Sequence, residues 1–335
     1  MSEFVCPVCR AALETERESL RCAACSRAFP VCAGIADLRV FPDPYLAADA
    51  DREKGRRLAE GAAGRPFAEW LEQYWSITEE TPAELARRYI RHDLVGEARG
   101  ESLLRALEDE WGESVGPGTR LLDLGCRSGG LLLAARRRGA VVTGVDIAFR
   151  WLVVARARLA ERHLEATLVC ACAQALPFPD QSFDAVIAGN VLEHTDDPGG
   201  LMRDASRVLR DGGGFLALTC NRYSLGPEPH VRLLGVGFLP RPLMASFVRW
   251  RRGVDYRYVR SLSYFELRAL AARWFGRWHI GLPDIGDAEQ SGLPGAEKRL
   301  LSLYRRIRDW PVVHPLLLLL GPLLQLGCVR AGARA

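Results

Sequence analysis

Four cysteines near the amino terminus are spaced as metal ligands. They form two pairs, Cys6-x2-Cys9 and Cys22-x2-Cys25, with twelve residues between the pairs. Two such pairs can surround one ion with four thiolates, which leaves no coordination position for a substrate. The sequence therefore predicts a structural zinc ion. Two reduced Cys-x2-Cys turns without metal, or a redox pair, are the alternatives.

A glycine-rich turn and a carboxylate form a second set. The stretch LLDLGCRSGG, residues 121–130, reads as a buried strand that runs into a turn able to approach a nucleotide-like ligand. Twenty-one residues after Gly125, the stretch VVTGVD ends on Asp146. An acid at that place can accept hydrogen bonds from both ribose hydroxyls of a nucleoside. Asp123 could instead cap a helix, and Gly129 could serve only strand–helix packing.

Two histidines are candidates for a catalytic base. His194 ends the stretch NVLEH, and His230 ends the stretch NRYSLGPEPH. We expect both on loops at the carboxyl edge of a sheet, where open α/β folds bind their ligands. Imidazole titrates near neutral pH and can remove a hydroxyl proton, although a lone histidine is more often structural.

Alternating elements must position these residues. Between Thr119 and Cys220 the pattern predicts strands at 120–124, 141–145, 183–188 and 214–219, and helices at 129–138, 149–162 and 200–209. Such alternation indicates a parallel sheet with helices on both faces. The stretches AELARRYI and ESLLRALEDEW have helical spacing, and SYFELRALAARWF predicts a helix with Ser263 as its N-cap and Glu266 completing a capping box.

Composition excludes several classes. The chain has 335 residues, of which 48% are hydrophobic and 26% charged, as in soluble globular proteins. A formal net charge of +4 is smaller than a dedicated nucleic-acid-binding protein would show. The first residues, MSEFVCPVCR, lack an apolar signal core, so secretion is not expected. Ten cysteines, four of them paired as ligands, favour a reducing compartment and a cytoplasmic location.

Further stretches establish a family resemblance. With ALPFPDQSFDAVIAGNVLEH and LMRDASRVLRDGGGFLALT, residues 119–220 resemble the class I S-adenosylmethionine-dependent methyltransferases, particularly the methyltransferase 11 branch. The cysteine segment resembles the short zinc ribbon that precedes many bacterial methyltransferases. The resemblance implies an α/β fold: a Rossmann-like, doubly wound, mostly parallel seven-stranded sheet with a small zinc ribbon and a helical cap. We expect a zinc ribbon at 1–40, a helical linker or cap at 41–115, and a methyltransferase domain at 116–335 with a cap insertion at about 221–262.

The same resemblance implies roles for individual residues in binding S-adenosylmethionine. It implies that the methionine half is surrounded by Asp123, Gly125, Cys126 and Gly129, and that the ribose is bound by Asp146. It also implies that the adenine is flanked by Ile147, Ala173 and Gln174, and that the floor beneath the sulfonium is lined by Asn190 and Val191. Two positions depart from the family pattern. Cys172 replaces an acid that holds the adenine amino group, and Arg127 replaces a glycine. We expect these two changes to weaken or rearrange cofactor binding.

Arg127 allows three interpretations. A left-handed backbone there would cost about 1–2 kcal/mol. With an ordinary backbone the side chain can project away from the ligand. The guanidinium could also pair with the ligand carboxylate.

Other segments leave alternatives open. In related quinone-pathway O-methyltransferases an acid–acid–histidine cluster is associated with a divalent metal; here Asn190 replaces the first acid, so a catalytic metal is not expected. Residues 223–264 would cover the acceptor, with Tyr74 and Trp75 joining them, or would form a core of their own. The uncharged run 310–329 is expected to end in a buried antiparallel strand, with contact to a membrane surface as the alternative.

The predicted function is methyl transfer from S-adenosylmethionine to a small, partly hydrophobic acceptor. Transfer to oxygen is favoured, on a secondary metabolite, a quinone-like compound or a sugar–lipid. A ribosomal-RNA base methyltransferase is the second possibility, because a zinc ribbon also precedes that type. A degenerate module that binds cofactor or partners without catalysis is the third, motivated by Arg127 and Cys172.

Overall fold

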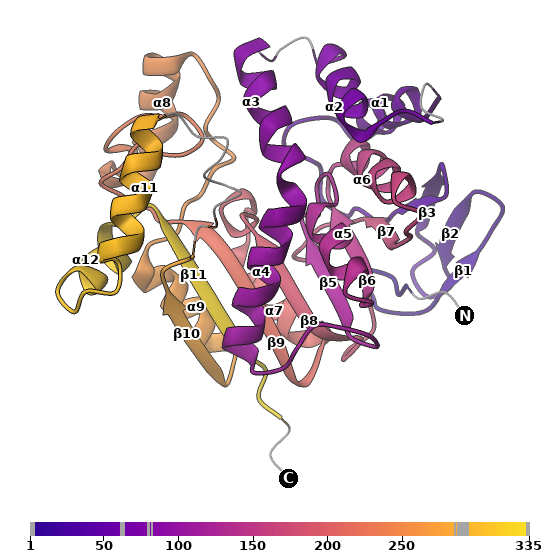
Figure 1. The fold of residues 1–335 in the computed structure, drawn as a ribbon. Helices are drawn as coiled ribbons and strands as arrows, with labels where there is room; N and C mark the ends of the chain where they lie inside the picture. Colours follow the sequence, from indigo (N-terminus) through magenta and orange to yellow (C-terminus); the bar gives the residue numbers. More distant parts are fainter. Residues whose placement is uncertain are drawn as a thin grey trace.

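Eleven strands form one continuous ladder in the computed structural model, which describes residues 4–60, 64–78, 81, 83–284, 286 and 295–332. The strand order is β1-β2-β3-β4-β7-β6-β5-β8-β9-β11-β10 (Figure 1). The strands are β1 (Leu13–Thr15), β2 (Ser19–Cys22), β3 (Ala28–Cys32), β4 (Ile35–Asp37), β5 (Arg120–Leu124), β6 (Val141–Asp146), β7 (Thr167–Cys170), β8 (Phe183–Gly189), β9 (Leu209–Cys220), β10 (Arg277–Gly281) and β11 (Leu323–Val329).

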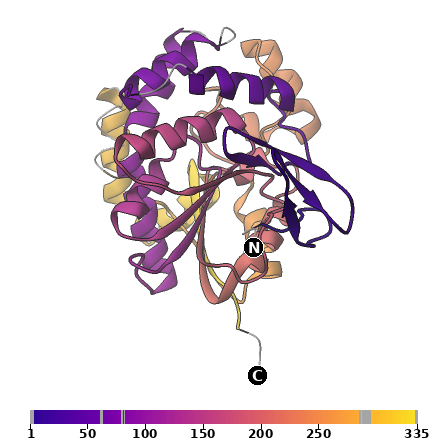
Figure 2. The same ribbon diagram turned by 90° about the vertical axis from the view of Figure 1, so that its right-hand side faces the viewer.

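Helices cover both faces of this sheet (Figures 1 and 2). They are α1 (Ala48–Glu60), α2 (Phe67–Ser76), α3 (Ala83–Leu94), α4 (Gly96–Trp111), α5 (Gly130–Arg137), α6 (Phe149–Glu161), α7 (Pro198–Val208), α8 (Arg241–Arg252), α9 (Tyr264–Trp274), α11 (Gly295–Ile307) and α12 (Val313–Leu320). Two short 3-10 helices, η1 (Leu192–His194) and η2 (Val236–Phe238), lie in the loops. The fold is therefore of the α/β methyltransferase type that the sequence predicts.

The central strands build two cores because successive strand side chains point to opposite faces. In β5, Leu121 packs with α2, α4, α5 and α6, whereas Leu122 packs with α7 and α9 on the other face. Both side chains are fully buried. A strand buried on both faces reads as a continuous apolar run, which is the pattern in RLLDL.

The sheet is wider than the predicted seven strands. The seven strands β5 to β11 lie within residues 116–335, the predicted methyltransferase domain, and the four strands β1 to β4 extend the same ladder. The junction is a parallel pairing of β4 with β7, in which Ala36 lies opposite Val169 and Asp37 opposite Cys170. The cysteine-rich segment is thus hydrogen-bonded into the main sheet at its edge (Figure 2).

The carboxyl-terminal run ends in the buried antiparallel strand that the sequence predicts. Strand β11 lies between β9 and β10 and is antiparallel to both. The apolar helix α12 precedes it, and it is short. Among the helices described, none combines the length and apolarity needed to cross a membrane.

The predicted strands and helices within 119–220 match β5, β6, β8 and β9 and α5, α6 and α7 to within a few residues, except that β9 begins at Leu209. The helix α9 has the expected capping box, in which the Ser263 side chain accepts from the Glu266 amide. Strands β7 and β10 were not among the predicted elements.

Candidate functional site

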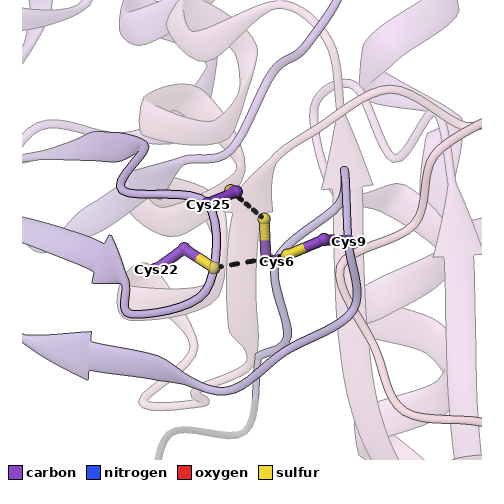
Figure 3. A group of neighbouring side chains, drawn as sticks. All are labelled: Cys6, Cys9, Cys22 and Cys25. Atoms are coloured by element: carbon purple, nitrogen blue, oxygen red, sulfur yellow. Dashed lines mark hydrogen bonds between the residues drawn. The ribbon is translucent and has the colours of Figure 1, made fainter.

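The four paired cysteines converge on one point (Figure 3). Their sulfur atoms all lie within 4.8 Å of one another, with Cys6 Sγ 3.7 Å from Cys25 Sγ and Cys9 Sγ 3.4 Å from Cys22 Sγ. Zinc–sulfur bonds of about 2.3 Å in a tetrahedron require sulfur atoms about 3.8 Å apart. The donor set and its spacing therefore fit a Zn²⁺ ion.

Each cysteine pair sits on a tight turn. Arg10 and Ser26, which directly follow the pairs, have left-handed backbones with φ of 64° and 58°. These turns let the amide of Arg10 donate to Cys6 O and the amide of Ser26 donate to Cys22 O. A backbone hydrogen bond from Cys25 lowers the pKa of Cys22 to about 7, which makes a thiolate available near neutral pH.

The cysteine segment is also docked on α7. The Arg10 guanidinium donates to Asp204 Oδ1 at 3.2 Å, and the Val5 amide donates to Pro177 O at 2.9 Å. Asp204 is buried and also accepts the amide of Leu176. These contacts tie the metal-ligating turns to the LPF stretch of the methyltransferase core.

The glycine-rich turn is pressed against the loop after β8. Gly125 has φ of 69°, and a Cβ there would lie 2.5 Å from Val191 Cγ2. Gly129 has φ of 74°, and a Cβ there would lie 3.1 Å from the Cβ of Ala155 in α6. Glycine is required at Gly125 both for its backbone and for the space, since side chains rarely adopt that φ.

Two buried acids stand beside this turn. The Asp146 carboxylate accepts the amides of Arg127 and Ala148, each at 2.8 Å, and so fixes the turn against the end of β6. Burial and the charge of Asp146 raise the pKa of Asp123 well above its usual range. Burial likewise raises the pKa of Asp146. Two such carboxyls favour a ligand that brings hydroxyl donors and positive charge.

Arg127 adopts the left-handed backbone, with φ of 43°, so the ordinary-backbone interpretation is wrong. Its side chain turns away from the Asp146 pocket and forms a two-point ion pair with Asp93 of α3, at 2.9 and 3.0 Å. The guanidinium also lies 4.2 Å from the ring centroid of Trp151. The third interpretation paired the Arg127 guanidinium with a carboxylate of the ligand. In this structure its carboxylate partner is Asp93.

A segment that the sequence did not single out covers the carboxyl ends of β6, β7 and β8. We call residues 38–45 the strap. The Leu38 amide donates to Cys170 O, Arg39 Nη1 donates to Ile147 O at 3.0 Å, and the Cys172 thiol donates to Phe41 O at 3.6 Å. The strap therefore packs against Cys172, the position at which the sequence departs from the family's acid.

A buried network of charges anchors the strap. Asp51 of α1 accepts the amides of Phe149 and Arg150 at the start of α6, which caps that helix from another part of the chain. Its carboxylate also pairs with Arg39 at 2.8 Å and Arg150 at 2.7 Å. Arg150 reaches a second buried acid, Asp43, at 2.8 Å. No local sequence pattern marked these residues.

The remaining expected cofactor residues lie around the same edge. Cys126 is buried, and its amide donates to Val145 O at the end of β6. Ala173 and Gln174 follow β7 and are partly exposed, and the Gln174 side chain packs near Gly200 of α7. Asn190 has φ of 58°, and its Oδ1 is buried without a partner among the described residues. A donor from a bound ligand would satisfy that oxygen.

The two candidate histidines are in direct contact. His194 Nε2 lies 3.1 Å from His230 Nε2, with the rings nearly perpendicular. The other ring nitrogen of His230, Nδ1, lies 2.5 Å from Glu228 Oε1. The other ring nitrogen of His194, Nδ1, lies 3.2 Å from the hydroxyl of Tyr45 in the strap. Four side chains from three loops thus form one hydrogen-bonded chain, of which sequence reasoning found two members.

The two imidazoles have different electrostatic surroundings. Burial lowers the pKa of His194. Burial also acts on His230, but the hydrogen bond and charge of Glu228 outweigh it and raise the pKa of His230 above its usual value. A proton that enters the pair is therefore held at His230.

The charge of Glu193 opposes the burial that lowers the pKa of His194, while its carboxylate is hydrogen-bonded elsewhere. Its carboxylate is fully buried, and Oε2 accepts from the Thr219 hydroxyl at 2.8 Å. Its Oε1 has no partner among the described residues, and one oxygen of the carboxylate lies within 4.8 Å of ligand atoms of Cys220 and His230. Burial raises the pKa of Cys220 well above its usual range, and both ring nitrogens of His230 are already hydrogen-bonded, so this set does not fit a metal as well as the four paired cysteines.

Tyr74 and Trp75, which the sequence grouped with the cap, pack among the amino-terminal helices. Tyr74 is buried, stacks on Trp151 with ring centroids 4.0 Å apart, and its hydroxyl accepts from Arg150. Trp75 stacks on Tyr89 of α3. Both rings belong to the packing of the first helices around the Arg127–Asp93 pair.

The cap segment, residues 221–262, has a small core around Val236, Met244, Val248 and Tyr256. Several of the apolar side chains expected to face an acceptor are instead exposed: Leu225, Phe238, Leu243 and Trp250. Only part of the cap's apolar content therefore serves its own packing.

Comparisons with known proteins agree with this geometry. A family profile described as a methyltransferase domain matches residues 122–217. The ubiquinone biosynthesis O-methyltransferase of Albidiferax ferrireducens is 35% identical over 208 residues, which cover 56% of this chain and 82% of that protein. The chain belongs to the S-adenosylmethionine-dependent methyltransferase family.

Two further curated relatives align over shorter stretches. The enzyme of the same name from Paracidovorax citrulli is 35% identical over 152 residues, 42% of this chain and 63% of that protein, and the one from Alkalilimnicola ehrlichii aligns over 66% of its length. The chain thus spans less than two thirds of these two relatives. A phosphoethanolamine N-methyltransferase 2 of Haemonchus contortus, solved with S-adenosyl-L-methionine, shares 19% identity, with 70% of this chain and 53% of that chain covered and a TM-score of 0.47.

Proposed function

We propose that this methyltransferase transfers the methyl group of S-adenosylmethionine to a hydroxyl of a small, partly hydrophobic acceptor, with His194 as the base. One observation carries the proposal: a hydroxyl, that of Tyr45, already lies 3.2 Å from His194 Nδ1. The imidazole therefore lies within hydrogen-bonding distance of a hydroxyl at the carboxyl edge of the sheet, where α/β folds bind ligands. Curated relatives named O-methyltransferases support transfer to oxygen.

The base and the glycine-rich turn are close neighbours. His194 lies three residues after Val191, and the Val191 side chain abuts Gly125. An acceptor hydroxyl at His194 would therefore face the turn that borders the cofactor pocket. Bound S-adenosylmethionine would supply an electrophilic methyl group there, and alignment of that methyl with the acceptor oxygen accounts for much of the catalysis.

Four residues support the assignment of the pocket to this cofactor. Asp146 keeps carboxylate lone pairs that the two amide hydrogen bonds do not use, and these can accept from ribose hydroxyls. Asp123 and the unpartnered Asn190 Oδ1 can accept from the methionine ammonium. Gly125 leaves room for close approach of the ligand to the backbone.

We further propose a structural zinc ion on the four paired cysteines and, with thiolate ligands that need reducing conditions, a cytoplasmic location. Such an ion would close its coordination shell with sulfur and would take no part in methyl transfer. Its effect on function would be indirect, because β3 and β4 connect the second metal-ligating turn to the strap.

The test is a screen of hydroxylated, partly apolar metabolites with methyl-labelled S-adenosylmethionine, followed by comparison with His194→Gln. We expect turnover to fall by about 10²–10⁴-fold in the variant, the range that a general base contributes. Cofactor affinity, measured by calorimetry, should stay unchanged. His279→Gln is the control, since it removes an imidazole on β10 that contacts Glu110 and none of the four side chains of the hydrogen-bonded chain. A His194→Gln enzyme as active as wild type, or label found in RNA, would contradict the proposal.

A further inference from the structure

The hydrogen bonds around His194 have a direction. We propose that Glu228 and His230 form a proton relay behind His194: they hold the lone pair of His194 Nδ1 toward the acceptor and receive, at His230, the proton that leaves His194 Nε2. This inference rests on the proposed function for the identity of the reaction. It adds Glu228 and His230 as positioning residues that act through His194.

The direction follows from a single fact, that an ionised carboxylate can only accept. Two backbone amides, those of His230 and Val231, donate to Glu228 Oε2, and His230 lies 2.5 Å from Oε1. His230 Nδ1 must therefore carry the hydrogen. In the neutral ring Nε2 is then an acceptor, so the contact of 3.1 Å requires His194 Nε2 to donate.

The same reasoning reaches the active end of the chain. A neutral His194 that donates from Nε2 has its lone pair on Nδ1, and the Tyr45 hydroxyl is the donor that meets it. The base nitrogen is thus Nδ1. In the absence of an acceptor, Tyr45 occupies the place of the acceptor hydroxyl and keeps the ring oriented.

The proton transfer balances along this chain. The acceptor O–H bond breaks and a Nδ1–H bond forms on His194, while the acceptor oxygen forms its bond to carbon and the carbon–sulfur bond breaks. The hydrogen on His194 Nε2 passes to His230 Nε2, which leaves His194 neutral. The positive charge lost by the sulfonium appears on His230, next to Glu228. Once the product leaves, the proton on His194 Nδ1 goes to water and the hydrogen on His230 Nε2 returns to His194 Nε2, which restores the starting tautomers.

The surrounding charges favour a protonated His230 next to Glu228. Glu193 and Glu228 are the anionic groups that act on both rings, and Arg127 on His194 and Arg88 on His230 are the opposing cations. The hydrogen bond and charge of Glu228 outweigh burial and raise the pKa of His230, whereas burial lowers the pKa of His194. Tyr45 faces the other nitrogen of His194, and Tyr256 and Cys220 lie near Glu228 without contributing a cation.

A pH profile distinguishes a relay from a merely structural contact. Activity requires the unprotonated pair, so turnover rises with pH through the apparent pKa of the pair. Glu228 stabilises the protonated pair, and Glu228→Gln should therefore shift this rise to lower pH. We also expect the plateau of kcat to fall by about 10–10²-fold, because the charge opposite His230 is lost while a hydrogen-bond acceptor remains. His230→Gln should lower kcat as well, and His279→Gln should change neither quantity.

Unchanged cofactor affinity and melting temperature in Glu228→Gln would show that the variant is folded. A kcat that falls without any shift of the profile would overturn the relay, since loss of packing lowers activity equally at every pH. A profile and kcat like those of wild type would overturn it too.

Ring nitrogen NMR tests the direction without any acceptor. In the neutral protein we expect the hydrogen of His230 on Nδ1 and that of His194 on Nε2, assigned with the two His→Gln variants. The opposite tautomer at His230 would overturn the relay, as would a bound metal ion that Cys220→Ser and His230→Gln both remove. Hydroxyl methylation with an unmoved profile would retain the proposed function and reject the relay. The expected tautomers in a protein that methylates no hydroxyl would retain the hydrogen-bond chain and reject the function.

Discussion

Replacing Arg127 with glycine tests how this chain tolerates an arginine in a glycine-rich turn. The residue has a left-handed backbone, with φ of 43°, which glycine adopts without strain. On backbone grounds alone Arg127→Gly should stabilise the protein. Its side chain, however, neutralises Asp93, whose carboxyl is 2% exposed and whose pKa is held well below its usual range despite burial.

The magnitudes decide the sign. Removing one partner of a fully buried ion pair costs about 3–5 kcal/mol. Because the Arg127 side chain is 35% exposed, solvent screens part of the pair, and about 2–3 kcal/mol is expected. Loss of the contact between the guanidinium and the Trp151 ring adds about 0.5–1 kcal/mol to the destabilisation. Relief of the backbone strain at position 127 offsets about 1–2 kcal/mol of it. The net destabilisation is about 2 kcal/mol, which corresponds to a melting temperature lower by about 3 °C for a chain of 335 residues.

Calorimetric melting of three variants isolates the pair: Arg127→Gly, Asp93→Asn and the double variant. In a double-mutant cycle the coupling energy should be about 2 kcal/mol, so the double variant should melt above the value that the two single changes predict when added. His163→Gly is the matched control. His163 has φ of 54° and is exposed, so glycine there should leave stability unchanged or raise it.

Two results would refute this reasoning. A melting temperature of Arg127→Gly equal to or above wild type would mean that the ion pair contributes less than the backbone strain. A normal melting temperature with strongly weakened S-adenosylmethionine binding would mean that the guanidinium contacts the ligand. We expect cofactor affinity to be unchanged in the folded variant.

Three further predictions concern the bound groups. Wild type should contain one zinc ion per chain, and the double change Cys22→Ala, Cys25→Ala should abolish it in elemental analysis; metal retained by that variant would contradict the four-cysteine site. Asp146→Ala should weaken S-adenosylmethionine binding by about 1–3 kcal/mol through lost charge-assisted hydrogen bonds, and identical calorimetric affinities would contradict its role at the ribose. Because the pKa of Asp123 is raised and a cationic ligand favours its ionised form, binding should release protons and tighten as pH rises. Calorimetry in buffers of different ionisation enthalpy measures that release, which Asp123→Asn should remove.

The sequence predicted the parts of this site that depend on local geometry. Two cysteines with two residues between them fit one metal-ligating turn, and Gly125 and Gly129 mark positions where the backbone needs positive φ. Strand and helix periods set the alternation that orders the sheet, and the Ser263 capping box spans one helical turn. Such features are visible within a few residues of chain.

The tertiary structure decided which side chains the site residues contact. Asp93 meets Arg127 across 34 residues, His230 meets His194 across 36, and Tyr45 meets His194 across 149. The positions of these pairs follow from how α3, the cap segment and the strap dock on the carboxyl edge of the sheet. No local period encodes such docking, because it depends on which buried surfaces fit together. The sequence alone therefore identified two separate histidines, and the fold joined them into one hydrogen-bonded chain.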